Sequence, residues 1–321
     1  MDIPLQLQLA PLIEQQTILV VGMHRSGTSL AARMINLMGA TVGPAEKLLP
    51  AHPYYNPTGY WEHTGIIDEH ERYLQAHGCG WTTIANFSTN KYLPERRHAL
   101  IAALRSIVAA IACDGKPLVV KDPRLCLLLD VWAGVVSRPI HVVVVRDPRK
   151  TAASLMAKYP HQFTTDYLLA LWQKYMQIAI GALCGELVLF VSYARLVTNV
   201  GAEHHRLWQG LVEMGVPSLR QLADHELQDL VDDRLDRSEP TSHAHLSTAQ
   251  ADLVAWLNEQ TQSKGAVTVT ARVAISEPNA VLSELETLRQ TYVKHGMEVA
   301  KQRKTTNWSL SATSAAHRGK C

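Results

Sequence analysis

The chain has 321 residues and a formal net charge of +2, and charged residues make up 19%, below the roughly 25% of ordinary globular domains. Hydrophobic residues make up 47%, which favours a packed core and excludes disorder as the dominant state. A net charge this small cannot by itself attract nucleic acid, so we expect no nucleic-acid partner and only local recognition of anions.

The cysteines and the N-terminal segment bear on the compartment. Five cysteines are spread along the chain without a CxxC pair, a pattern typical of free thiols in a reducing environment. The first residues carry no Lys or Arg before Arg25, unlike a secretory signal. No apolar run reaches the ~20 residues that a bilayer span needs. We therefore expect a cytoplasmic protein that is not an integral membrane protein.

Continuous apolar runs predict buried parallel strands, because a sheet covered on both faces has no polar side. These runs lie at 17–22, 117–121, 140–146 and 186–192. Amphipathic patterns predict helices over 28–38, 97–112 and 201–215. This alternation predicts an α/β fold, a three-layer sandwich with a central parallel sheet.

The composition predicts four segments. They are an N-terminal arm at 1–16, a main domain at 17–236, a helical extension at 237–304 and a disordered tail at 305–321. Ser247 and Gln250 are spaced as a capping box at the start of a helix. Residues 281–304 form a polar pattern with one apolar stripe. We favour packing of this helix on the main domain over its alternative, a homo-oligomer joined through it.

The stretch 18–38 predicts a phosphate-binding loop. A buried strand runs into Gly22, a tight turn follows, and a helix begins near 26–28. Gly22 and Gly27 allow backbone angles that other residues disfavour. The consecutive N–H groups of Ser26–Ser29 would point at an anion, assisted by the helix dipole.

The spacing of Gly22 and Gly27 matches the phosphate loop of nucleotide-binding enzymes, but Thr28 stands where an ATPase or GTPase has lysine. The positive charge is on Arg25, inside the loop. We find no convincing acidic magnesium ligand at a strand end, and we expect no metal site. A nucleotide or small-molecule kinase with an atypical phosphate loop is therefore disfavoured, and it is kept as the alternative function.

With these residues, the chain resembles the sulfotransferases that use 3′-phosphoadenosine 5′-phosphosulfate (PAPS). The segment HRSGTS is similar to their 5′-phosphosulfate loop. A second motif of the family is an arginine after a strand, followed by a serine eight residues later, and VVVVRDPRKTAASL matches it. The resemblance implies that Arg146 and Ser154 bind the 3′-phosphate. It also implies that the 5′-phosphosulfate is bound by His24, Arg25, Ser26, Gly27, Thr28 and Ser29.

Two further segments resemble the family. Lys121 in VVKDPR follows a strand, as in the bacterial and tyrosylprotein branch, where this lysine reaches the sulfuryl group. Tyr193 in FVSYARL is similar to the tyrosine of the family's Y-E-D-L segment near the adenine, although Ala194 and Arg195 replace the acidic pair. The resemblance covers 17–214 and implies a P-loop NTPase-like sulfotransferase fold, with 17–236 as the catalytic domain.

The resemblance implies a bacterial enzyme that transfers the sulfuryl group of PAPS, without a metal, to a hydroxyl or amine. The acceptor would be a small molecule, a glycan or a lipid-linked sugar. By analogy with phosphoryl transfer, the protein mainly positions the reactants and neutralises charge. Arg25 and Lys121 would stabilise the oxygen that leaves the sulfuryl group. A non-catalytic nucleotide-binding module is a third possibility.

An alcohol acceptor also needs a general base. In related bacterial and tyrosylprotein sulfotransferases, a glutamate in the loop after the first helix serves as the general base. The resemblance therefore makes Glu46, 21 residues after Arg25, the first candidate. Glu62 competes, because its loop is rich in aromatic residues. His52 and His63 are weaker candidates. The aromatic residues between 54 and 61 either stack on an acceptor or cover the core, and the sequence favours neither.

Overall fold

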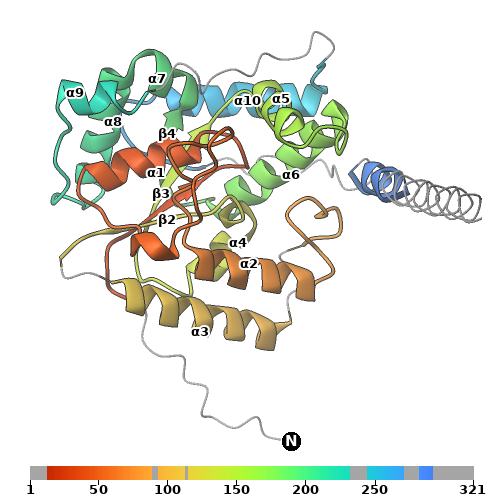
Figure 1. Ribbon diagram of the computed structural model, residues 1–321, viewed down its shortest axis with the longest axis horizontal. Coiled ribbons are helices and arrows are strands. Elements are labelled where there is room, and N and C mark those ends of the chain that lie inside the picture. The colour runs from red at the N-terminus through yellow and green to blue at the C-terminus, as the bar shows by residue number, and fades with distance from the viewer. Residues whose placement is uncertain (1–12, 89–92, 113–114, 232–243, 271–281, 292–321) are drawn as a thin grey trace, which may run out of the picture.

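The computed structural model describes residues 13–88, 93–112, 115–231, 244–270 and 282–291. At its centre is a five-stranded sheet in the order β2-β1-β3-β4-β5 (Figure 1). The strands are β1 (Thr17–Val21), β2 (Leu118–Lys121), β3 (Pro139–Val145), β4 (Leu187–Ser192) and β5 (Val267–Thr268). The first four pair in parallel, and β5 joins β4 antiparallel. The predicted parallel sheet is confirmed, and each predicted strand end lies within one residue of the observed end.

Helices cover both faces of the sheet, and three of them, α1, α3 and α8, correspond to the helices predicted at 28–38, 97–112 and 201–215. The helices are α1 (Thr28–Leu37), the 3-10 helix η1 (Ala45–Lys47), α2 (Thr64–Ala76), α3 (Pro94–Ile111), α4 (Leu125–Trp132), α5 (Pro148–Lys158), α6 (Thr165–Ala182), α7 (Tyr193–Thr198), α8 (Val200–Glu213), α9 (Asp224–Gln228) and α10 (Thr248–Thr261).

The side chains of β1 divide between two apolar cores, one on each face of the sheet. Leu19 and Val21 join the core formed with α2–α6 and α10. Ile18 and Val20 join the core formed with α1 and α7–α9. All four side chains are fully buried, as expected of a strand covered on both faces. The predicted three-layer α/β sandwich is confirmed.

The described residues after position 236 also contribute to the apolar core. The predicted capping box starts α10: Ser247 Oγ accepts from the Gln250 amide at 3.3 Å, and Gln250 Oε1 accepts from the Ser247 amide at 3.0 Å. Leu253 and Leu257 of α10 lie in the core. Residues 282–291 are helical, and Leu282 is buried in the same core.

The predicted boundary near 236, most of the N-terminal arm, the rest of the predicted helix at 281–304 and the tail lie outside the described residues. The division into four segments therefore stays a prediction, as does the alternative of a homo-oligomer.

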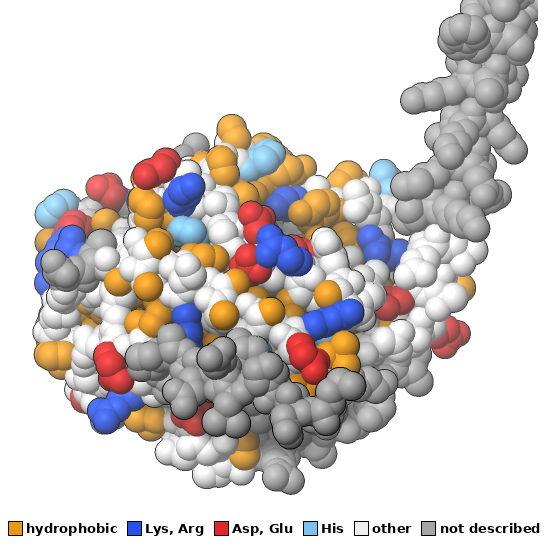
Figure 2. Space-filling model, turned by 90° about the horizontal axis from the view of Figure 1, so that it is seen from below, with side chains coloured by type: hydrophobic (Ala, Val, Ile, Leu, Met, Phe, Trp, Pro, Cys, Tyr) orange, Lys and Arg blue, Asp and Glu red, His pale blue; other side chains and the backbone are white. Residues whose placement is uncertain are grey.

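The surface carries charges of both signs. On the face shown in Figure 2, the blue Lys and Arg side chains are interspersed with red Asp and Glu side chains. Within the described ranges, the helices are too short or too polar for any of them to cross a bilayer. The described side chains of His, Cys, Asp and Glu form no group of three that could hold a metal ion.

Candidate functional site

The loop between β1 and α1 presents backbone N–H groups to a pocket. Gly27 caps α1 with a left-handed φ of 93°, and no side chain caps this helix. Because the first amides of a helix have no partner within it, those of Thr28 and Ser29 are oriented to bind an anion. The Ser26 side chain is buried, and its hydroxyl donates to the Met23 carbonyl at 2.5 Å.

Position 27 requires glycine for two reasons, its left-handed backbone and the close approach of the Tyr193 ring. A Cβ at this position would lie 2.0 Å from Cδ2 of Tyr193. Gly27→Ala is therefore expected to destabilise the protein by more than the ~1–2 kcal/mol that a left-handed backbone costs a residue with a side chain. Thermal unfolding measures this loss. Gly39→Ala is a control for the backbone cost alone, because Gly39 also has a positive φ, 119°, and a Cβ added there would have no atom within 4 Å. Equal losses for the two variants would show that Tyr193 does not constrain the loop.

Arg25 connects the phosphate loop to two other segments. It has a φ of 67°, an uncommon backbone conformation for a residue with a side chain. Its Nε donates to Ser154 Oγ at 3.0 Å, and its Nη1 donates to the Tyr55 carbonyl at 3.0 Å. The Arg25 carbonyl in turn accepts a hydrogen bond of 2.7 Å from Nη1 of Arg146. The two anion-binding motifs predicted from the sequence therefore meet in one place.

Two guanidinium groups lie close together in this cluster. Arg146 is 7% exposed, and its guanidinium carbon lies 4.4 Å from the ring centroid of Tyr193. Burial, and after it the charge of Arg146, lowers the pKa of the Arg25 guanidinium. Neighbouring buried cations repel each other, and a bound anion would relieve that repulsion. The electrostatics of the cluster therefore favour an anionic ligand.

Glu62 and Lys121 form a buried ion pair near the end of β2. Lys121 is 4% exposed and Glu62 is 6% exposed, and Nζ of Lys121 donates to Oε1 of Glu62. Burial raises the pKa of Glu62 above its usual 4.5, although the charge of Lys121 acts in the opposite direction. A carboxylate with a raised pKa in a pocket is a candidate proton acceptor.

A buried network supports the loop that follows Lys121. Trp132 Nε1 donates to His70 Nε2 at 3.1 Å, so the proton of the neutral imidazole is on Nδ1. That Nδ1 lies 2.8 Å from Oδ2 of Asp122, to which it donates. Arg124 pairs with Asp122 at 2.7 Å and with Glu71 at 2.5 Å. Burial would raise the pKa of Asp122, but Arg124 and His70 together lower it. Both ion pairs of Arg124 are therefore structural, since they hold Asp122 and Glu71 in place.

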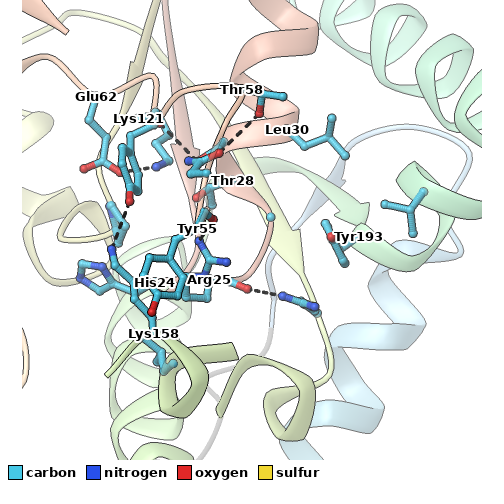
Figure 3. A pocket seen from close by; sticks show the side chains of 18 of the residues that line it. His24, Arg25, Thr28, Leu30, Tyr55, Thr58, Glu62, Lys121, Lys158 and Tyr193 are labelled. Carbon is cyan, nitrogen blue, oxygen red and sulfur yellow. Dashed lines mark hydrogen bonds and ion pairs between the residues drawn. The ribbon is translucent and has the colours of Figure 1, made fainter. Parts of the chain in front are cut away.

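The pocket has two chemically different ends (Figure 3). At one end lie Glu62 and Lys121, with His24 and Lys158 on the same side of the view. Arg25 lies between this end and the other, where Leu30 and Tyr193 are seen. Leu30 and Tyr193 belong to the apolar core formed with α1 and α7–α9, and three further residues of that core, Val197, Leu230 and Val231, also line the pocket. A polar end, a cationic middle and an apolar end match an elongated ligand whose charge is in its middle.

The loop before α2 covers the phosphate loop. Ser29 Oγ donates to the Tyr60 carbonyl at 3.3 Å, and Asn56 Nδ2 donates to Ser29 Oγ at 3.4 Å. Tyr55 and Tyr60 line the pocket, whereas Tyr54 is 69% exposed. The aromatic loop thus covers the phosphate loop and lines the pocket, and the stacking of its rings on an acceptor stays a prediction.

The structure brings together most of the side chains selected from the sequence. Those that line the pocket are His24, Arg25, Gly27, Thr28, Ser29, Glu62, Lys121, Arg146 and Tyr193. Ser154 accepts a hydrogen bond from Arg25, and the Ser26 hydroxyl donates to the Met23 carbonyl within the loop. Glu46 is exposed in η1 and is not among the lining residues.

The pocket lining also includes three residues that were not predicted from the sequence, Lys158, Trp81 and Asn56. A signal was available for Lys158, since it follows Ser154 by four residues and so shares its face of α5. No pattern in the sequence marks Trp81 or Asn56.

One comparison with known proteins identifies the family of the chain. The sequence profile described as the Sulfotransferase family matches residues 17–212, more than half of the chain. No curated protein matches the chain significantly.

The solved structures to which the chain is similar include two sulfotransferase domains. The one from the curacin biosynthetic pathway is 15% identical, with a TM-score of 0.47 over 78% of this chain and 99% of that one. The one from the olefin synthase of Synechococcus PCC 7002 is 18% identical, with a TM-score of 0.39 over 85% and 95%. A sulfotransferase of Mycobacterium tuberculosis H37Rv is 12% identical, with a TM-score of 0.37 over 78% and 77%.

Proposed function

Because the chain belongs to the sulfotransferase family, we propose that its pocket transfers the sulfuryl group of PAPS to a hydroxyl or amine of a small molecule, glycan or lipid-linked sugar. One observation carries the choice of donor. Arg25 contacts both residues of the second motif, Ser154 at 3.0 Å and Arg146 at 2.7 Å. A donor with phosphate at both its 5′ and 3′ positions would need two such anion sites next to each other.

The residues fit this donor along the whole pocket. The amides of Thr28 and Ser29 and the Arg25 guanidinium would hold the 5′-phosphosulfate. Arg146 and Ser154 would hold the 3′-phosphate. The apolar side chains of Leu30 and Val197 offer a surface for the adenine. When bound, PAPS would supply an activated sulfuryl group attached to a phosphate leaving group.

Arg25 and Lys121 have distinct tasks in this proposal. As the bond between sulfur and the bridging oxygen breaks, negative charge grows on that oxygen, and Arg25 would neutralise it. Lys121 would hold the sulfuryl oxygens. Both cations are fixed before the reaction, Arg25 by Ser154 and Tyr55 and Lys121 by Glu62. Little reorganisation would be needed during transfer.

Glu62 is the glutamate that we propose as the general base. The acceptor O–H would give its proton to the Glu62 carboxylate while the acceptor oxygen bonds to sulfur. Lys121 favours the ionised, proton-accepting form of Glu62 before transfer. Glu46 has no such environment, since it is exposed on η1.

A direct assay tests this function. The full chain is incubated with PAPS and a library of hydroxyl and amine acceptors, and products are followed by mass spectrometry. We expect one or more acceptors to gain a sulfuryl group, with equimolar release of 3′,5′-adenosine bisphosphate. Phosphorylation from ATP in place of sulfation would support the kinase alternative. Tight binding of PAPS without turnover on any acceptor would support the non-catalytic module.

A further inference from the structure

Lys158 is a cation of the pocket that no carboxylate neutralises within the described part of the chain. It is the last residue of α5. Its Nζ donates to the hydroxyl of Tyr60 at 3.2 Å, and it lies 5.0 Å from the ring centroid of Tyr60 and 5.1 Å from that of Tyr159. The pocket's other lysine, Lys121, is paired with Glu62. The ring faces stabilise the ammonium without neutralising its charge.

The position of Lys158 assigns it to the polar end of the pocket. In Figure 3, Lys158 lies beside His24, on the side of Glu62 and Lys121 and away from Leu30 and Tyr193. The charges of Lys121 and Lys158 both contribute to the low pKa of His24, after the larger effects of burial and Arg124. The ammonium group therefore lies on the same side of the pocket as the proposed base and on the opposite side from Leu30 and Tyr193.

Flat aromatic surfaces surround this end. Trp81 lines the pocket, and its ring centroid is 4.4 Å from that of His24 and 5.8 Å from that of Tyr159. Burial keeps His24 neutral at ordinary pH by lowering its pKa well below 6.5. An acceptor here would meet ring faces, a neutral imidazole and one lysine ammonium group with N–H donors to spare.

We propose that Lys158 selects acceptors that carry an anionic group, a carboxylate or a phosphate, attached to a ring close to the hydroxyl that receives the sulfuryl group. The ring would stack on Trp81 and Tyr159, and the anion would replace the Tyr60 hydroxyl as the partner of Lys158. Charge-assisted hydrogen bonds of this kind are short and strong. This inference rests on the proposed function, and it names the class of acceptor that the function leaves open.

The test uses the full chain saturated with 3′,5′-adenosine bisphosphate and titrated by calorimetry with matched phenols. 4-Hydroxyphenylacetate is compared with its uncharged amide, and 4-hydroxyphenyl phosphate with hydroquinone, which separates carboxylate from phosphate. We expect each anion to bind about tenfold more tightly than its neutral partner, the preference that one charged hydrogen bond gives. Lys158→Met and Lys158→Gln should abolish the preference, and Lys158→Arg should keep part of it.

Lys116→Met is the matched control, since Lys116 is exposed and does not line the pocket. Equal affinities for anion and neutral partner in the unmodified protein, or no binding of either anion, overturn the inference. So does a preference that survives both truncations of Lys158. Bisphosphate binding lost only in the Lys158 variants would place Lys158 in the donor site instead, which also overturns it. Failure of the unmodified protein to bind the bisphosphate would count against the proposed function itself.

Discussion

Replacing Glu62 with Gln is expected to lower the rate of sulfuryl transfer by about 10²–10⁴-fold, the range that a positioned general base contributes. The amide keeps the shape of the side chain but cannot take the acceptor proton. Steady-state turnover measures the loss. Binding of 3′,5′-adenosine bisphosphate and thermal unfolding should be followed in parallel, because the substitution leaves Lys121 as a buried cation without its ion-pair partner.

Glu46→Gln is the matched control for this experiment. Glu46 is exposed on η1, and we expect its turnover to stay within about threefold of the unmodified protein, as surface substitutions usually do. A large loss in Glu46→Gln with normal turnover in Glu62→Gln would reverse the assignment of the base.

The same assignment predicts a pH dependence. Burial raises the pKa of Glu62 above 4.5, and only the ionised form accepts a proton. The value of kcat/KM should therefore fall as the pH drops through that raised pKa, and this acid limb should disappear in Glu62→Gln.

Replacing Arg25 with Met is expected to lower kcat by about 10²–10³-fold, the effect of removing one preorganised donor from a developing negative charge. The affinity for 3′,5′-adenosine bisphosphate should fall much less, because the amides of Thr28 and Ser29 and the guanidinium of Arg146 remain. Calorimetry and steady-state kinetics separate the two effects.

Arg33→Met on α1 controls for the loss of one positive charge, since Arg33 does not line the pocket. A loss in Arg25→Met that is confined to donor affinity, with kcat unchanged, would show that Arg25 binds the ground state and does not stabilise the transition state.

The sheet could be predicted from sequence because its strands are buried on both faces. Runs such as 140–146 are apolar almost without interruption, and this pattern has few alternatives in an α/β protein. The two-residue strand β5 is too short to produce a pattern, and it pairs with a strand that is distant in the sequence. The start of α10 was predictable because the Ser247 and Gln250 side chains each bond to the other residue's backbone.

The candidate site was predictable where its chemistry is local. The phosphate loop is one turn of chain, and Arg146 and Ser154 lie just before and within α5, so their spacing could be matched to the motif of the family that the chain resembles. The choice between Glu46 and Glu62 as the general base could not be made from local sequence. It depends on the path of the loop, where the Leu49 amide bonds to the Glu62 carbonyl at 2.8 Å. Lys158 and Trp81 likewise come to line one pocket only in the folded chain.

The proposed function requires two adjacent anion sites that hold a nucleotide with phosphate on both its 5′ and 3′ positions. Calorimetric comparison of 3′,5′-adenosine bisphosphate with 5′-AMP tests it most directly. We expect the bisphosphate to bind at least about tenfold more tightly, because charged hydrogen bonds to the second phosphate each add about 1.5–3 kcal/mol. Arg146→Met should remove most of that difference. Equal affinities of the unmodified protein for the two nucleotides would contradict the claim.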